Sequence, residues 1–583
     1  MPVEAIRRGS AAIPEVAGIM PPSSRQALDL AVEELRGHAA EWAALPLAER
    51  IALVEELRRD VARVAERWAT LSLQAKGIAP DEPAAGEEWI TGPYLVLRNL
   101  RLLRRSLAAI AAHGRPRIPG PVSTRANGQV VARAFPSDVW DRLLYRGFTG
   151  EVWMQPGLTL EELPESQALA YREKGAGGSV VLVLGAGNIS SIAPMDALYK
   201  LFVEKQVVLL KMNPVNAYLG PVIAEGFRAL IARGFFHVVY GGAAEGEYLC
   251  RHEGVDEIHI TGSDRTHDAI VFGKGEEGAR RKAERRPVLV KKITSELGNV
   301  TPVIVVPGPW RDSDLALQAA NVATQLMYNG GFNCVTSRVI VTWAGWPQRD
   351  AFLAALRKVL AAVPPRYAYY PGAEERYAAF LAKHPEGEQF GGRTADRLPW
   401  TLIPNLDPAR DGDICFTTEA FCGIIGEAPI AAPTIPEFVD RAVSFVNEIV
   451  WGTLAAGLIV HPRSLRDPEV TAAVERAVAG LRYGTVSLNQ WAAAGYALAV
   501  TPWGAFAGSD IFDVQSGVGV VHDTLMFSRV QKTVFRGPFR AWPTPPWFVT
   551  CRTAHLVGRR IAGFEVRPSI WKLLGVMAAA VRG

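Results

Sequence analysis

The sequence predicts an α/β protein whose parallel sheet is covered by helices on both faces. The first observation is a series of short apolar runs, rich in β-branched residues, that begins at residue 179: SVVLVLG, QVVLLK, FHVVYG and EIHITG. The second is that helical stretches such as NAYLGPVIAEGFRALIARG separate these runs. Strands that alternate with helices are typical of a parallel sheet buried on both sides.

The other elements follow in chain order. Residues 26–71 are predicted to be helical, because apolar side chains recur every three or four positions in AERIALVEELRRDVARVAERWATL. Residues 114–166 are richer in proline and glycine, which indicates a long excursion with short strands. TPVIVVPG at 301–308 predicts another strand and SDLALQAANVATQLMYN a helix, and the alternation resumes through 400–500.

Length and composition indicate a globular chain with more than one domain. Its 583 residues predict two or three domains. A net charge of +4 is too small to support nucleic-acid binding. The five cysteines contain no C-x-x-C pair, which argues against disulfides and a zinc site and favours a cytoplasmic location. The first residues lack the apolar core of a signal peptide, and no apolar run is long enough to span a membrane.

The loops after the predicted strands are the expected ligand sites, because open parallel sheets bind ligands at the carboxyl ends of their strands. GAGNIS at 185–190 begins like a G-x-G-x-x-G dinucleotide motif, but Ser190 stands where the third glycine belongs. Cys334 lies in NGGFNCVTSRVIV at 329–341, between a glycine pair and an apolar run. From this stretch alone, Cys334 could be a core residue, a metal ligand or a nucleophile.

Nine stretches occur in a characteristic order along most of the chain. They are GAGNISSIAP, VVLLKMNP, VDEIHITGS, SELGNVTP, NGGFNCVTSR, TTEAFCG, NEIVWGTLAAGLIV, PWGAF and QKTV. Each is short, but in this order, from about residue 26 to 537, the chain resembles the aldehyde dehydrogenase superfamily. The resemblance implies a parallel-sheet cofactor domain, an α/β catalytic domain and a small β element for oligomerisation.

The resemblance also implies three catalytic residues. Cys334 would be the nucleophile, because addition of a thiolate to the carbonyl creates the tetrahedral carbon from which hydride leaves. Because the thiolate is the reactive form, Cys334 is expected to lie in an electropositive, partly open site. Asn188 would donate to the developing oxyanion, and Glu296 would activate the water that releases the acid. Without the resemblance, a buried inert cysteine, a turn asparagine and a surface glutamate would be the ordinary interpretations.

Five further residues match the family's cofactor site. Lys211 would hydrogen-bond the adenosine ribose, and Gly262 and Ser263 would meet the pyrophosphate at a strand-to-helix turn. Ser263 could equally be a helix N-cap. Glu419 would hold the nicotinamide ribose, with Phe421 beside it. We also infer that the glycines beside Cys334 allow substrate and nicotinamide to approach it closely.

The chain departs from the family's pattern at several places. Pro214 stands where a glutamate commonly disfavours a 2′-phosphate, so NAD and NADP both remain open. The basic stretch 273–287 could favour a phosphate but is also typical of a solvated loop. Arg338 follows Cys334 by four positions, a spacing that, with GNVTP, resembles the acylating branch, which makes or reduces acyl-CoA. A non-catalytic scaffold is the alternative from another class.

These observations predict the domain organisation of the chain and its partners. Residues 1–145 and 168–292 are expected to bind the cofactor, 293–522 to form the catalytic domain, and 146–167 with 523–537 to supply oligomerisation strands. Residues 538–583 form a basic extension, which could touch an anionic membrane, help bind a fatty aldehyde, or pack on the protein itself. The expected partners are a small-molecule aldehyde and further copies of the chain, as a homodimer or homotetramer.

Overall fold

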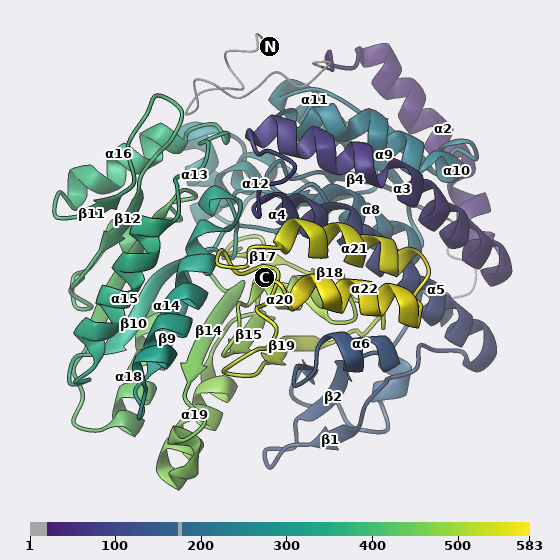
Figure 1. Cartoon of the computed structure of the whole chain (residues 1–583). Helices are drawn as coiled ribbons and strands as arrows, with labels where there is room; N and C mark the ends of the chain where they lie inside the picture. The colour runs from purple at the N-terminus through teal and green to yellow at the C-terminus, as the bar shows by residue number, and fades with distance from the viewer. Residues whose placement is uncertain (1–19, 173–177) are drawn as a thin grey trace.

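The computed structural model describes residues 20–172 and 178–583, which form two large sheets surrounded by helices (Figure 1). Among these residues, one sheet has six strands in the order β17-β8-β7-β4-β5-β6. They are β4 (Val180–Leu184), β5 (Val207–Lys211), β6 (Phe236–Val239), β7 (Glu257–Thr261), β8 (Lys292–Glu296) and β17 (Gly517–Val518). β4 to β8 are parallel, and β17 pairs antiparallel with β8. The four apolar runs that begin at residue 179 therefore form β4 to β7, as predicted.

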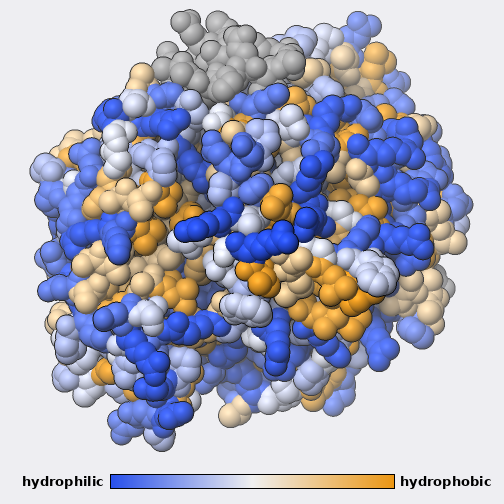
Figure 2. All heavy atoms as spheres, viewed as in Figure 1, coloured by the Kyte–Doolittle hydropathy of each residue, from blue (hydrophilic) through white to orange (hydrophobic). Residues whose placement is uncertain are grey.

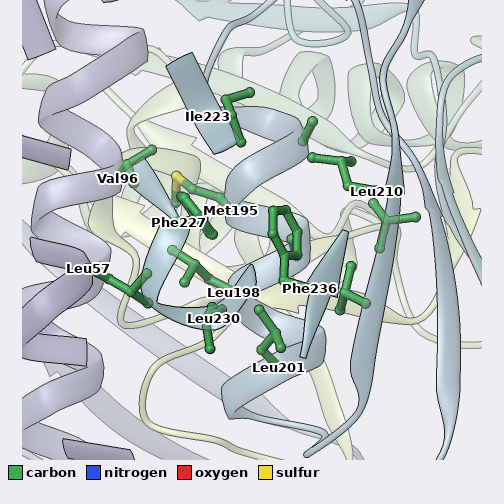
Figure 3. Close-up of a cluster of buried hydrophobic side chains, with 14 of the residues drawn as sticks. Leu57, Val96, Met195, Leu198, Leu201, Leu210, Ile223, Phe227, Leu230 and Phe236 are labelled. Carbon is green, nitrogen blue, oxygen red and sulfur yellow. The ribbon is translucent and has the colours of Figure 1, made fainter. Parts of the chain in front are cut away.

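The core beside this sheet is built from residues distant in sequence. Helices on its faces include α2 (Arg25–Ala44), α3 (Leu47–Lys76), α5 (Leu95–His113) and α8 (Ile192–Phe202). Figure 3 shows Leu57 of α3 and Val96 of α5 directed toward Leu198 of α8 and Phe236 of β6, all fully buried. Each such side chain contributes about 2 kcal/mol by leaving water, which holds the N-terminal helices on the sheet.

The second sheet has eleven strands within the described ranges, in the order β1-β2-β3-β19-β15-β14-β9-β10-β13-β12-β11. They are β1 (Val122–Thr124), β2 (Val130–Phe135), β3 (Thr149–Met154), β9 (Thr301–Val306), β10 (Ser337–Trp343), β11 (Glu388–Phe390), β12 (Trp400–Ile403), β13 (Ile424–Ile430), β14 (Ala455–Val460), β15 (Thr485–Leu488) and β19 (Val530–Arg536). The strands from β19 to β12 are parallel, whereas β1 to β3 and β11 pair antiparallel at the two edges.

The predicted oligomerisation strands lie side by side. β3 and β19 pair antiparallel, with Val152 opposite Thr533. Through this pairing, the excursion after residue 114 joins the large sheet. Contact of this region with another subunit remains a prediction.

The remaining elements connect and cover the sheets. The α-helices are α4 (Ala85–Trp89), α6 (Val139–Leu144), α7 (Leu169–Arg172), α11 (Ala243–Arg251), α12 (Asp264–Val271), α14 (Asp312–Met327), α15 (Arg349–Ala362), α16 (Ala373–Lys383), α17 (Ile414–Thr417), α18 (Ile435–Glu448), α19 (Pro468–Gly480) and α20 (Ala493–Leu498). The single-turn elements are η1 (Ile90–Tyr94), η2 (Leu163–Ser166), η4 (Tyr328–Gly331) and η5 (Ser464–Arg466), and β16 (Pro502–Gly504) pairs with β18 (Val520–His522).

The stretch 216–234 is helical, as predicted, and consists of three short elements: η3 (Pro214–Leu219), α9 (Gly220–Gly226) and α10 (Arg228–Ile231). The basic stretch 273–287 is not a loop, because it contains α13 (Gly275–Ala283). Glu277 pairs with Arg280 at 2.7 Å and with Arg281 at 3.0 Å on this exposed helix, and such i,i+3 and i,i+4 pairs stabilise a helical turn.

The C-terminal extension forms two helices, α21 (Ala554–Val566) and α22 (Ile570–Ala580), drawn in yellow in Figure 1. α21 approaches α4 so closely that a Cβ on Gly86 would lie 2.4 Å from the carbonyl carbon of Ala554. Glu565 of α21 is fully buried and pairs with Arg98 and Arg101 of α5. The extension is therefore an integral part of the molecule. Within the residues that the structure describes, no helix combines the length and apolar composition needed to cross a membrane.

Candidate active site

Cys334 follows a tight turn after α14. Asn329, Gly330 and Gly331 all have positive φ angles, of 53°, 66° and 80°. A Cβ on Gly331 would lie 2.7 Å from the carbonyl oxygen of Cys422. Neither glycine lines a cavity beside the thiol. The glycine pair therefore serves the left-handed backbone and its close packing, not the approach of ligands that we expected.

The Cys334 thiol faces the carboxyl group of Glu296. Glu296 is the last residue of β8, and its Oε1 atom lies 3.1 Å from Cys334 Sγ. Its Oε2 atom is buried without a hydrogen-bond partner among the described residues. A nucleophile and a base thus lie within hydrogen-bond reach of each other, as covalent catalysis requires.

Burial keeps this pair protonated. Loss of solvation, with a smaller effect of Asp196, raises the pKa of Glu296 to about 8. Burial also raises the pKa of the Cys334 thiol, and the carboxylates of Glu296 and Glu419 raise it further. The prediction of an electropositive site was wrong, because the charged groups with the largest effect on the thiol are acids. The thiol is partly open, as expected.

Asn188 follows β4 and is held from several sides. Its side-chain Nδ2 atom donates to the Phe332 backbone carbonyl at 2.9 Å. The backbone carbonyl of Asn188 accepts from Lys76 Nζ at 3.2 Å and from Tyr369 Oη at 2.9 Å. The second hydrogen of the amide has no acceptor within the described part of the chain. Asn188 therefore lies beside the thiol segment with one donor still free.

A buried ionic network lies beneath the Cys334 turn, and no local sequence pattern predicted it. Lys76, at the end of α3, contacts Glu88 Oε1 at 2.7 Å and Asn329 Oδ1 at 2.8 Å. Glu87 accepts from the Asn329 backbone at 2.8 Å and from Arg366 at 2.8 Å. In the sequence, Lys76 before Gly77 is typical of an ordinary helix C-terminus, and no local signal connects it to a turn 253 residues away.

A wide cleft of about 900 Å³ opens on one side of Cys334, at the carboxyl ends of β4, β5 and β7. Its walls include all five predicted cofactor residues: Lys211, Gly262, Ser263, Glu419 and Phe421. Pro214, the departure from the family's glutamate, also lines it.

Ser263 lines the cleft and is also the N-cap of α12, where its hydroxyl accepts from the Thr266 backbone N–H at 3.2 Å. Burial changes the pKa values of two other residues of the cleft. Burial lowers the pKa of Lys211 to about 8 and raises that of Glu419 to about 7. Glu419 Oε1 has no hydrogen-bond partner among the described residues, so a polar acceptor faces the cleft uncompensated.

A narrow cavity of about 130 Å³ also includes Cys334 in its lining, and its walls are almost entirely apolar. It shares four residues with the cleft: Asn188, Ile192, Glu296 and Cys334. The rest of its wall includes aromatic and aliphatic side chains from η1, the 135–148 region, α20 and the extension, among them Tyr94, Tyr145, Phe148, Trp491, Tyr496, Trp547 and Ile561. The cavities thus meet at the thiol, and sequence motifs identified only the cleft.

Comparisons with known proteins agree with this arrangement. A model of the aldehyde dehydrogenase family matches residues 150–365. The folds of aldehyde dehydrogenase 21 from Physcomitrella patens, in complex with succinate, and of a mutant aldehyde dehydrogenase C from Pseudomonas syringae, in complex with NAD⁺ and octanal, superpose with TM-scores of 0.60 and 0.59. Both superpositions cover 89% of this chain, at 15% and 16% identity, and 92% and 90% of those chains. The chain is thus similar to the aldehyde dehydrogenase family over residues 150–365 and shares the fold of these solved structures.

Curated aldehyde dehydrogenases match the chain only in part. A 4-trimethylaminobutyraldehyde dehydrogenase from Danio rerio is 26% identical over 314 residues, 49% of this chain and 54% of its own length. An aldehyde dehydrogenase named LUC3 from Fusarium sp is 25% identical over 180 residues, 30% of this chain and 35% of its own length. The matched segments thus span about a third to a half of these relatives.

Proposed function

We propose that the protein oxidises an apolar aldehyde to a carboxylic acid with NAD or NADP as the oxidant. The carrying observation is the position of Cys334, whose thiol lies 3.1 Å from Glu296 where a narrow apolar cavity meets a wide polar cleft. Such a junction would let a substrate carbonyl and a cofactor ring reach one sulfur from two different cavities.

The residues of the cleft fit a dinucleotide. Its volume of about 900 Å³ is sufficient, and Ser263 opens a helix whose N-terminus favours phosphate. Lys211 and Glu419 offer a donor and an uncompensated acceptor for ribose hydroxyl groups. The chemistry that NAD or NADP supplies when bound is the acceptance of a hydride from the substrate carbon.

Covalent attachment would begin at Cys334. The sulfur forms a bond to the carbonyl carbon while the thiol proton is lost to solvent, because Glu296, with a pKa of about 8, is already protonated at neutral pH. The carbonyl electrons move to oxygen, where the free Asn188 hydrogen and the Cys334 backbone N–H stabilise the charge. After hydride loss, Cys334 holds the acyl group as a thioester.

Release would need Glu296 as a base. Glu296, after it has released its own proton to solvent, removes a proton from water, the new C–O bond forms, and the C–S bond breaks to return the thiolate and the acid. Transfer to CoA is the alternative suggested by the short spacing from Cys334 to Arg338. Arg338, however, lies at a β-bulge of β10 and donates to the backbone oxygens of Gly331 and Ile424, outside both cavities. The spacing therefore has a structural role that is independent of CoA.

The narrow cavity supports an uncharged, apolar substrate. Its one arginine, Arg98, is already paired with Asp141 at 2.8 Å and with Glu565 at 3.3 Å, so it offers no free charge for an anionic substrate. The Pseudomonas syringae relative was crystallised with octanal, an aldehyde of this chemical class.

The test is reduced-nicotinamide absorbance with acetaldehyde, hexanal, octanal, benzaldehyde and succinic semialdehyde, each with NAD and NADP and with and without CoA. We expect turnover without CoA, fastest for the apolar aldehydes. Cys334→Ala should abolish turnover but still bind the cofactor, whereas Cys415→Ala, a buried cysteine outside both cavities, should stay active. Residual activity of Cys334→Ala above a few per cent would exclude the covalent mechanism, and inactivity on the whole panel would favour a scaffold.

A further inference from the structure

α22 exposes apolar side chains on the face that points away from the molecule. Ile570, Leu574 and Val581 lie on one side of the helix at spacings of four and seven, and they are 50%, 52% and 53% exposed. Trp571 beside them is 79% exposed. Leu573, Val576 and Ala579 on the opposite side are buried. Figure 2 shows a continuous apolar patch over this part of the extension.

The patch continues onto a neighbouring helix. α6 lies beside α21, where Trp140 packs edge-on against Phe564 with ring centroids 5.6 Å apart. α6 exposes Val139 and Leu143, at 57% and 49%. We call Ile570, Trp571, Leu574 and Val581, with Val139 and Leu143, the α22 face.

Positive charge borders the α22 face. Arg567, Lys572 and Arg582 are exposed on the extension, and Arg142 and Arg146 are exposed on and after α6. Arg567 and Arg582 form no ion pair within the described ranges of the chain, and Lys572 Nζ donates to the Gly563 carbonyl at 2.8 Å. The extension's single acid, Glu565, is buried against Arg98 and Arg101, so it cannot offset this charge at the surface.

We propose that the α22 face docks on an anionic lipid bilayer, with α22 lying in the plane of the headgroups. Apolar and tryptophan side chains surrounded by lysine and arginine are the combination that binds such an interface. Because Leu573, Val576 and Ala579 hold α22 on the protein, docking needs no unfolding. Charge favours lipid over a second copy of the chain, since a symmetric contact through this face would bring the same cations together.

Docking would also bring the cavity wall close to the membrane. The extension supplies Pro546, Trp547 and Ile561 to the narrow cavity. If the proposed function holds, an apolar aldehyde dissolved in the bilayer would be available beside the site that consumes it. The docking itself does not depend on catalysis, because it rests on the exposed face alone.

The test is flotation of the full chain with vesicles at low salt. We expect binding to vesicles of equimolar phosphatidylcholine and phosphatidylglycerol, no binding to pure phosphatidylcholine, and a loss of about tenfold in high salt. Trp571→Ser with Leu574→Ser should abolish binding, and so should Arg567→Glu with Arg582→Glu. The matched control, Leu160→Ser with Val290→Ser, removes exposed apolar side chains elsewhere and should bind normally. Thermal melting checks that each variant is folded.

Three results would overturn the proposal. One is that the wild-type chain fails to float with the anionic vesicles at low salt. Another is that the control double variant loses as much binding as the α22 variants. The third is that light scattering shows Trp571→Ser with Leu574→Ser dissociating an oligomer while the wild type ignores vesicles, which would make the face a contact between copies. Because flotation needs no turnover, an inactive enzyme that floats would refute the proposed function and leave this inference standing.

Discussion

The two cavities that meet at Cys334 differ in size, polarity and origin. The cleft of about 900 Å³ is lined by the loops after β4, β5 and β7, where glycines, Lys211 and Ser263 offer polar groups. The cavity of about 130 Å³ is lined by aromatic and aliphatic side chains from η1, α5, α20 and the extension. Four residues belong to both: Asn188, Ile192, Glu296 and Cys334.

The contrast separates segments that resemble aldehyde dehydrogenase motifs from segments that do not. The walls of the cleft come from stretches that match family motifs, so their chemistry constrains the sequence closely. The walls of the cavity come partly from the extension and the 135–148 region, where any well-packed apolar side chain could serve. If the proposed function holds, reaction chemistry and substrate choice depend on different segments, and substitutions should separate them.

The largest expected effect is on turnover and comes from Glu296, which lines both cavities. Glu296→Gln should transfer hydride once per site and then stall, because the thioester lacks a base to activate water. The substitution also removes the carboxylate that raises the pKa of the thiol, so the first step should persist. We expect a burst of reduced cofactor in stopped flow, followed by steady turnover about 10²–10⁴-fold below wild type. Undiminished, CoA-dependent turnover would instead assign the enzyme to the acylating branch.

A smaller effect should be confined to the narrow cavity. Trp547→Ala should lower kcat/KM for octanal about tenfold, because the lost indole surface contacts the substrate chain. The kcat/KM for acetaldehyde and the KM for the cofactor should each change less than about twofold. Trp542→Ala is the matched control, since this tryptophan is 80% exposed and lines neither cavity. Equal losses for both aldehydes would mean that Trp547 supports the fold and not the substrate.

The smallest expected effect is on the thermal stability of the protein and concerns Glu419, a residue of the cleft. Burial raises the pKa of Glu419 to about 7, so the folded state binds a proton more tightly than the unfolded state. This favourable term is complete below the ordinary carboxyl pKa and is lost as pH rises through about 7. Glu419→Gln should therefore raise Tm by about 2 °C at pH values above 8 and leave it unchanged near pH 4.

Calorimetry at both pH values is the measurement, with the exposed Glu161→Gln as control. A gain in Tm at low pH alone would show that Glu419 stabilises the fold as a carboxylate.

The sequence predicted the cleft better than the cavity for a physical reason. Lys211, Ser263 and Glu296 end strands or begin helices, so short local patterns place them at one sheet edge. Ile561 joins the cavity through the packing of α21 on α5, and Trp547 lies against Phe148 with ring centroids 6.2 Å apart, so both positions depend on contacts across hundreds of residues. Lys76 and the acidic surroundings of Cys334 were invisible for the same reason, because neither sequence position carries information about its distant neighbours.

The buried contact between Glu565 and α5 also sets an order for the folding of the newly made chain. Arg101 and Glu565 are 464 residues apart, and a ribosome adds about 5–20 residues per second, so roughly 20–90 s of synthesis separates the two. Until Glu565 emerges, Arg98 and Arg101 lack a carboxylate that they need for burial, and α5 cannot complete its side of the narrow cavity. The N-terminal helices and strands β4 to β8 can collapse during translation, but the wall of the narrow cavity is complete only after α21 has been made.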